Sequence, residues 1–167
     1  NMSLLDKILK NSTIKTTSTL SESKIFSQQD EVTTPIPAIN VAVSGRLDGG
    51  YLPGITVFAG PSKHFKSSFA LLLAKAYMEK NPDSVMLFYD NEFGAPQAYF
   101  ENMGIDMDRV AHIPITNIEE LKFDLAKQLS ELEESEKVIV VIDSVGNLAS
   151  KKEAQNALEE NSAADMT

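Results

Sequence analysis

The 167-residue chain contains no cysteine and no tryptophan, and it has only two histidines. The lack of cysteine excludes a disulfide framework and thiolate-based metal sites. His64 and His112 alone are too few for a structural zinc site. No apolar run approaches the roughly 20 residues that a membrane-spanning helix requires, and the first residues lack the apolar core of a signal peptide. We therefore expect a soluble, intracellular protein.

The composition that remains is that of a globular domain with an uneven charge. Hydrophobic residues make up 43% of the chain, which also has 8 Gly and 7 Pro, as is typical of one domain. Residues 1–80 carry 9 Lys or Arg and 6 Asp or Glu, whereas residues 81–167 carry 6 and 18. An acidic excess usually reflects solvated helix faces. It does not decide whether nucleic acid is a partner, because a few local cations can make that contact.

Residues 1–32 are expected to form an N-terminal helix followed by a linker or arm. Residues 3–10 predict a short amphipathic helix, because the apolar residues of this stretch share one side at helical spacing. Residues 11–24 are rich in Ser, Thr and Lys, which predicts a linker. Ile25 and Phe26 are apolar in this polar setting, so they can dock on this domain or on a neighbouring molecule.

Residues 33–167 are expected to form the core, beginning with loops and turns over 33–54, where Pro and Gly recur. Short β-branched and apolar runs predict strands over 55–59, 85–89, 110–113 and 138–142. Helical spacing predicts helices over 66–80, 96–103, 117–134 and 151–160. This alternation predicts an α/β fold with a mainly parallel sheet and flanking helices. Ligands of such sheets bind beyond the carboxyl ends of the strands.

A candidate phosphate loop follows the first predicted strand and precedes the first core helix. Its nine residues are Gly60, Pro61, Ser62, Lys63, His64, Phe65, Lys66, Ser67 and Ser68. They match the P-loop pattern (Walker A) G-x-x-x-x-G-K-[ST] except that Phe65 replaces the second Gly. Backbone N–H groups of such a loop and of the helix N-terminus cradle phosphates. Lys66 would face the β- and γ-phosphates of ATP, and the Ser67 hydroxyl would bind magnesium.

The bulky residue in the phosphate loop leaves a second interpretation open. Gly at position 65 would allow a backbone conformation, or a close approach, that the Phe65 side chain hinders. The alternative is an ordinary loop and helix cap with a solvent-exposed Lys66. His64 is interpreted as an exposed loop residue in preference to a metal ligand.

Two acidic residues follow predicted strands at the same edge of the sheet. Glu92 comes after the 85–89 strand, where a carboxylate can orient or deprotonate the water that attacks the γ-phosphate. Asp143 ends the 138–142 strand, which is the Walker B pattern of a magnesium-binding acid. The alternative for each is an ordinary loop carboxylate. Tyr99 can stack on adenine, and the alternative for Tyr99 is a buried helix aromatic.

These segments, in this order, resemble the ATPase core of RecA-family recombinases, and most closely the tailed-phage branch of the UvsX type. That branch also has a bulky Phe before the loop lysine, in a Gly-Pro-Ser-Lys-x-Phe-Lys-Ser sequence. The segments Phe88–Gly94 and Ile142–Glu153 are similar to it as well. The resemblance covers nearly the whole chain, from about residue 4 onward.

The resemblance implies a DNA-dependent ATPase that forms filaments on single-stranded DNA, pairs it with a homologous duplex and exchanges strands. It implies catalytic roles for Glu92 and Lys66, magnesium binding by Ser67 and Asp143, and adenine stacking by Tyr99. It also implies self-association through the N-terminal helix and arm, and a location in the cytoplasm of a phage-infected bacterium.

Family members are roughly twice as long as this chain, so we expect it to correspond to their N-terminal portion, with an incomplete sheet. The first DNA-binding loop would fall at about residues 154–164, which contain no cation, so no DNA contact is assigned there. Two alternatives stay open for the function. One is another ATPase of this fold, such as a replicative helicase, and the other is a nucleotide-binding or self-associating module without turnover.

Overall fold

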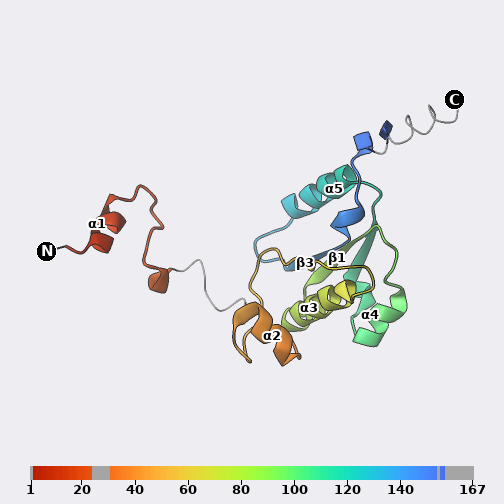
Figure 1. Cartoon of the computed structure of the whole chain (residues 1–167), viewed down its shortest axis with the longest axis horizontal. Coiled ribbons are helices and arrows are strands. Elements are labelled where there is room, and N and C mark those ends of the chain that lie inside the picture. The colour runs from red at the N-terminus through yellow and green to blue at the C-terminus, as the bar shows by residue number, and fades with distance from the viewer. Residues whose placement is uncertain (1, 24–30, 154, 157–167) are drawn as a thin grey trace.

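A computed structural model describes residues 2–23, 31–153 and 155–156 of the chain and confirms an α/β architecture (Figure 1). Three strands form a parallel sheet in the order β2-β1-β3, and their bounds are Val85–Asp90 for β1, Val110–Pro114 for β2 and Val138–Asp143 for β3. In this register Asp90 lies opposite Pro114 on one side and Asp143 on the other. The carboxyl ends of the three strands therefore meet at one edge of the sheet.

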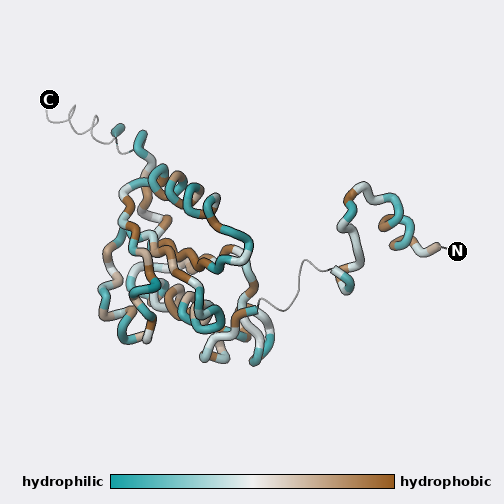
Figure 2. Tube along the Cα trace, turned by 180° about the vertical axis from the view of Figure 1, so that it is seen from behind, coloured by the Kyte–Doolittle hydropathy of each residue, from teal (hydrophilic) through white to brown (hydrophobic). Residues whose placement is uncertain are grey.

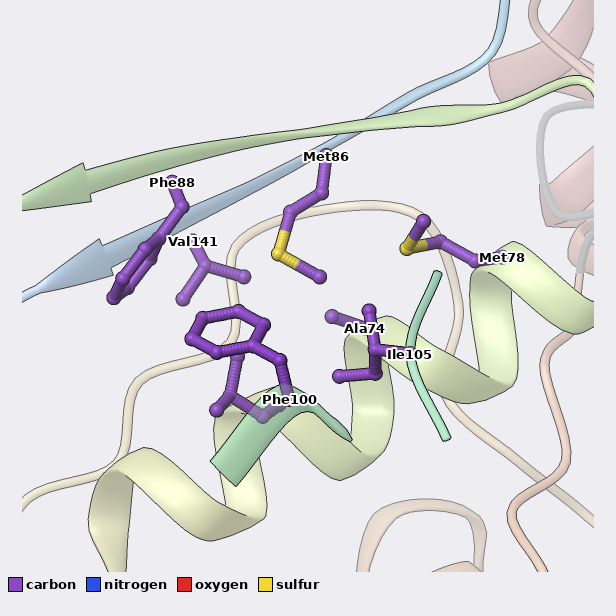
Figure 3. Close-up of a cluster of buried hydrophobic side chains, with 8 residues drawn as sticks. Ala74, Met78, Met86, Phe88, Phe100, Ile105 and Val141 are labelled. Carbon is purple, nitrogen blue, oxygen red and sulfur yellow. The ribbon is translucent and has the colours of Figure 1, made fainter. Parts of the chain in front are cut away.

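Helices cover both faces of the sheet, as predicted. Helix α3 (Lys66–Lys80) and helix α4 (Gln97–Met103) pack on one face, and helix α5 (Ile118–Ser130) packs on the other. The core on the α3 side is shown in Figure 3, where side chains from the sheet meet those from both helices and from the turn after α4: Ala74, Met78, Met86, Phe88, Phe100, Ile105 and Val141. On the α5 side, Leu87 and Tyr89 of β1 pack against Leu121.

The ends of α4 and α5 follow from local sequence signals. Gly104 terminates α4 with a left-handed backbone (φ 71°), the conformation that glycine adopts most easily. Asn117 caps α5 by accepting a hydrogen bond from the Glu120 N–H. Helix α5 ends at Ser130, four residues before the predicted end at 134, so Leu132 lies outside the helix. Single 3-10 turns lie at Leu20–Glu22, Met107–Arg109 and Val145–Asn147.

The stretch 33–54, predicted as loops, contains helix α2 (Pro37–Ser44). Pro37 occupies the first turn, where its missing N–H costs nothing, and Gly45 ends the helix in a left-handed conformation (φ 74°). The rest of the stretch folds back, because Tyr51 forms an antiparallel bridge with Val32. The Tyr51 hydroxyl donates to the Leu73 carbonyl (2.6 Å) and so fastens this segment to α3.

The N-terminal helix α1 (Leu4–Asn11) is formed as predicted, and it lies apart from the sheet and its helices (Figures 1 and 2). Ser3 and Asp6 make a reciprocal capping box at its start. Within the described residues, each hydrogen bond of residues 3–23 stays inside that segment. Leu4, Leu5 and Ile8 of α1 are exposed, and Leu9 is partly buried. Ile25 and Phe26, predicted to dock, lie outside the described residues.

The prediction of a strand over Ile55–Ala59 is wrong. These residues have no strand assignment, and the side chains of Ile55 and Val57 are 96% and 78% exposed. Phe58 is half-buried and its ring stacks against Phe69 of α3, with ring centroids 6.1 Å apart. A strand requires a neighbouring strand to accept and donate its backbone hydrogen bonds, and the described part of the chain offers none beside this segment.

The predicted helix over 151–160 is helical at 151–153 and 155–156, and its other residues lie outside the described part. Of the stretch 154–164, where the first DNA-binding loop was predicted, the structure describes only residues 155–156. In the part of the chain that the structure describes, no helix has the length and apolar character needed to cross a membrane.

Candidate functional site

The start of α3 and the end of β3 meet beside the carboxyl edge of the sheet. The Ser67 hydroxyl donates a 2.6 Å hydrogen bond to Oδ2 of Asp143, although the two residues are 76 positions apart in the chain. Helix α3 begins one residue earlier, at Lys66. The structure therefore brings together the two residues that the sequence assigns to magnesium.

The loop after β1 is joined to the end of β3 and to Ser144 by four further hydrogen bonds, one of which is a long contact from the Glu92 N–H to the Asp143 carbonyl (3.4 Å). The Asn91 N–H donates to the Asp143 carbonyl (2.9 Å), and the Ser144 N–H donates to the Asn91 side-chain oxygen. The Ser144 hydroxyl donates to Oε1 of Glu92 (2.9 Å), and Glu92 itself is exposed. The predicted catalytic carboxylate of Glu92 is thus held by Ser144, the residue that follows the predicted magnesium ligand Asp143.

The phosphate loop is stabilised mainly by contacts within itself. The Lys66 ammonium donates to the Pro61 carbonyl (2.8 Å), so the lysine side chain lies back across its own loop. His64 is exposed, and its Nδ1 lies 2.8 Å from the Ser62 carbonyl. A lysine that contacts a neutral carbonyl can exchange that contact for an anionic phosphate oxygen, which is the stronger acceptor.

Phe65 adopts a left-handed backbone (φ 58°, ψ 19°) at the position where the P-loop pattern has glycine. Glycine reaches this region without strain, whereas another residue loses roughly 1–2 kcal/mol there. The Phe65 side chain is 72% exposed, so most of the ring faces solvent. The loop accommodates Phe65 at this position with a strained backbone and an exposed side chain.

Tyr99 lies on α4 and is 46% exposed, which excludes the alternative that it is the buried aromatic of that helix. Its neighbour Phe100 fills that role against Phe88 of the sheet. No hydrogen bond joins Tyr99 to the Ser67–Asp143 or Ser144–Glu92 contacts. Adenine stacking by Tyr99 therefore stays a prediction.

The oxygen atoms at the site suit magnesium better than a transition metal. Among residues 2–23, 31–153 and 155–156 there is no group of three or more His, Cys, Asp or Glu side chains that could hold a metal. Magnesium prefers oxygen ligands and is commonly held by one or two protein groups, with phosphate oxygens and water completing the octahedron. The Ser67 hydroxyl and the Asp143 carboxylate fit that requirement.

Tyr89, the residue before Asp90, is a fully buried ionisable group on the α5 face of the sheet. Its burial raises the pKa of the phenol above its usual value, and the hydrogen bond to Asp124 (2.7 Å) adds to that rise because it favours the protonated form. Tyr89 therefore donates to Asp124 as a neutral phenol and ties the end of β1 to helix α5.

Asn91 and Ser144 are functional candidates that sequence reasoning did not single out. Asn91 directly follows β1 and precedes Glu92, and Ser144 directly follows β3 and Asp143. Their roles come from contacts across the sheet edge, between β1 and β3. Only adjacency of polar residues to strand ends could have suggested them, and that signal is weak because loops are generally polar.

Comparison with known proteins adds an independent observation. No protein-family model matches the chain. Over 164 residues, 98% of its length, the chain is 49% identical to a protein of Enterobacteria phage T4 described as a "Recombination and repair protein". The chain spans 42% of the length of that curated relative.

Proposed function

We propose that this chain is the ATP-binding part of a phage recombination protein of the RecA/UvsX type, and that residues 60–68 with Asp143 bind ATP and magnesium. Two observations support the proposal. The phosphate loop and the acid after β3 are joined by the 2.6 Å bond between Ser67 and Asp143. The chain is also similar along nearly its whole length to a phage protein described as a "Recombination and repair protein".

In this proposal the phosphates of ATP lie at the N-terminus of α3, where free N–H groups and the helix dipole favour anions. Lys66 leaves the Pro61 carbonyl for the β- and γ-phosphate oxygens. Ser67 and Asp143 hold the magnesium ion, which when bound neutralises charge on those phosphates. Tyr99 is proposed to stack on adenine.

Hydrolysis is assigned to Glu92. Its carboxylate orients a water molecule and takes a proton from it as the water oxygen bonds to the γ-phosphorus and the bond from that phosphorus to the bridging oxygen breaks. The products are ADP and inorganic phosphate. Ser144 and Asn91 keep Glu92 beside the Asp143 end of β3, because their hydrogen bonds tie the two strand ends together.

DNA binding, homologous pairing and strand exchange are proposed for the longer protein of which this sequence would be a part. Self-association is proposed for α1, whose apolar residues Leu4, Leu5 and Ile8 are exposed. An amphipathic helix with an uncovered apolar face gains stability by packing on a partner surface.

The direct test of binding is titration of the chain with a fluorescent ATP analogue and magnesium. Lys66→Ala removes the charge that faces the phosphates, and we expect affinity to fall about tenfold to a hundredfold. Lys122→Ala, an exposed lysine of α5 on the opposite face, is the matched control and should bind as the wild type does. Equal affinity in wild type, Lys66→Ala and Lys122→Ala would reject the phosphate-loop assignment.

Turnover separates the proposed function from its alternatives. Glu92→Gln should retain nucleotide binding and lose hydrolysis, whereas Glu101→Gln, an exposed glutamate of α4, should change neither. Stimulation of hydrolysis by single-stranded DNA supports the recombinase. Hydrolysis without such stimulation supports another ATPase of this fold, and saturable binding without hydrolysis supports a nucleotide-binding module.

A further inference from the structure

Asp90, the last residue of β1, is a buried carboxylate (3% exposed) beside the loop that carries Glu92. A buried charge is tolerated only where hydrogen bonds compensate for lost hydration. Its Oδ1 accepts hydrogen bonds from two successive backbone groups, the N–H of Glu92 (3.1 Å) and the N–H of Phe93 (2.8 Å). One oxygen of Asp90 thus fixes the backbone of the Glu92 loop.

The other oxygen of Asp90 is occupied by a histidine from the neighbouring strand. Nε2 of His112 on β2 lies 3.0 Å from Oδ2 of Asp90. We assign the donor role to Nε2 of His112, because a carboxylate oxygen without a proton can only accept. This contact leaves Oδ1 free for the two loop N–H groups.

The orientation of the His112 ring is set by the sheet. His112 lies opposite Phe88 in the register of β1 and β2. Phe88 precedes Asp90 by two residues, so both side chains lie on the same face of β1. The two rings stack with centroids 5.6 Å apart and planes inclined by 26°. Phe88 is itself buried in the core against Phe100, so the surface on which the imidazole rests is rigid.

We propose that His112 is a positioning residue for Glu92, acting through Asp90. The imidazole holds the Asp90 carboxylate, the carboxylate holds the N–H groups of Glu92 and Phe93, and the loop presents the Glu92 side chain to the nucleotide. The part of this inference that concerns hydrolysis rests on the proposed function, whereas the hydrogen-bonded clamp does not.

This clamp complements the contacts from β3. From β3, the Ser144 hydroxyl holds the side chain of Glu92, and the Asp143 carbonyl makes a long contact with the Glu92 N–H (3.4 Å). Asp90 and His112 hold the N–H groups of Glu92 and Phe93 from the β1 and β2 side. Loss of the His112 donor should leave the phosphate loop unaltered, because Lys66 and Ser67 contact Pro61 and Asp143. Nucleotide affinity and turnover should therefore respond differently.

Two variants of His112 separate the hydrogen bond from the packing. His112→Phe keeps a ring on Phe88 and removes the donor. His112→Gln keeps a side-chain N–H at a similar distance from the backbone and removes the ring. We expect His112→Phe to lower turnover about tenfold, the size of effect typical of a lost supporting contact, with nucleotide affinity within twofold of wild type. His112→Gln should recover most of that turnover.

The clamp itself is measured without nucleotide, by amide hydrogen exchange in the whole chain. In His112→Phe the Glu92 and Phe93 amides should exchange about tenfold faster, while the amides of Met86 to Phe88 inside β1 keep their rates; in His112→Gln all should stay near wild type. Unchanged exchange at Glu92 and Phe93 in His112→Phe would overturn the proposal. Equal acceleration along the whole of β1 in both variants would also overturn it, since it would indicate a general packing role.

The two kinds of failure are distinguishable. If the wild type neither binds nor hydrolyses ATP, the proposed function fails, and the exchange comparison still decides whether His112 holds the Glu92 loop. If the wild type hydrolyses ATP and His112→Phe turns over at the wild-type rate, the positioning role fails while the proposed function stands.

Discussion

Strand β1 and the segment Ile55–Ala59 are both rich in apolar and β-branched or aromatic residues, but only β1 forms a strand. Both are short apolar runs that lead into a loop of the candidate site. Strand β1 lies between β2 and β3, and five of its six residues are buried. The segment Ile55–Ala59 has no strand neighbour in the described residues, and most of its side chains are exposed.

The contrast shows that β-propensity describes how well a side chain suits a sheet surface and does not by itself form a strand. β1 has backbone partners on both sides, so each of its polar groups can be paired where water is absent. Ile55–Ala59 contacts α3 through the Phe58–Phe69 stack, and its other residues are exposed.

The candidate site has two halves that differ in the same way: one follows paired strands and the other follows the unpaired segment. The acidic half, after β1 and β3, is cross-linked by hydrogen bonds of Asn91 and Ser144. The phosphate-loop half follows the unpaired segment and is attached to the acidic half by Ser67 and Asp143. The proposed ATP–magnesium site requires both halves.

The largest expected effect is a loss of stability from the interior of β1. Phe88→Ala should lower the free energy of unfolding by about 3–5 kcal/mol, because it removes a buried ring from the core. Val57→Ala, in the exposed segment, should change it by less than about 0.5 kcal/mol. Urea unfolding of the wild type and of both variants measures these two changes. A comparable loss from Val57→Ala would mean that the segment packs as a strand in solution and would remove the contrast.

A smaller effect is expected at the Tyr89 hydroxyl. Tyr89→Phe removes its hydrogen bond to the Asp124 carboxylate and should lower the free energy of unfolding by about 1.5 kcal/mol at neutral pH. Because folding raises the pKa of Tyr89, its contribution is fully present below the ordinary phenol pKa of about 10 and is lost as the pH rises toward the folded value.

The pH dependence checks this assignment in the same unfolding experiment. Wild type should lose stability above about pH 10, and Tyr89→Phe should lose less over that range. Tyr51, whose pKa burial also raises, accounts for a remaining slope in Tyr89→Phe. Identical slopes in wild type and Tyr89→Phe would mean that the phenol of Tyr89 is not buried in solution.

The smallest expected effect lies in the phosphate loop. Phe65→Gly should raise the free energy of unfolding by up to about 1 kcal/mol, because glycine adopts the left-handed backbone of this position without strain. Phe65→Ala keeps the strained backbone and should give no such gain, which makes it the control. If Phe65→Ala stabilised the chain as much as Phe65→Gly, the exposed ring and not the backbone would be the source of strain.

The sequence predicted the elements whose partners are part of the described chain. The runs at 85–89, 110–113 and 138–142 are strands because they pair with one another, and α3 begins at the predicted Lys66. Helix α2 was missed although Pro37 and Gly45 are ordinary start and stop signals, since neighbouring prolines and glycines also predict turns.

The site could be predicted only as far as local patterns extend. The phosphate loop and the acids after two strands follow from motifs, and the contacts of Ser67 and Glu92 bring the two motifs together. The supporting residues Asn91, Ser144 and His112 act across strand boundaries. Such contacts depend on the register of the sheet, and no local pattern encodes that register.

The most direct test of a single ATP–magnesium site is a double-mutant cycle on Ser67 and Asp143, measured by ATP-analogue titration with and without magnesium. Ser67→Ala and Asp143→Asn should each abolish most of the gain in affinity that magnesium gives the wild type. The double variant should be little weaker than either single variant, because both remove the same interaction. Full additivity of the two losses, or a wild-type affinity that magnesium does not change, would contradict the account.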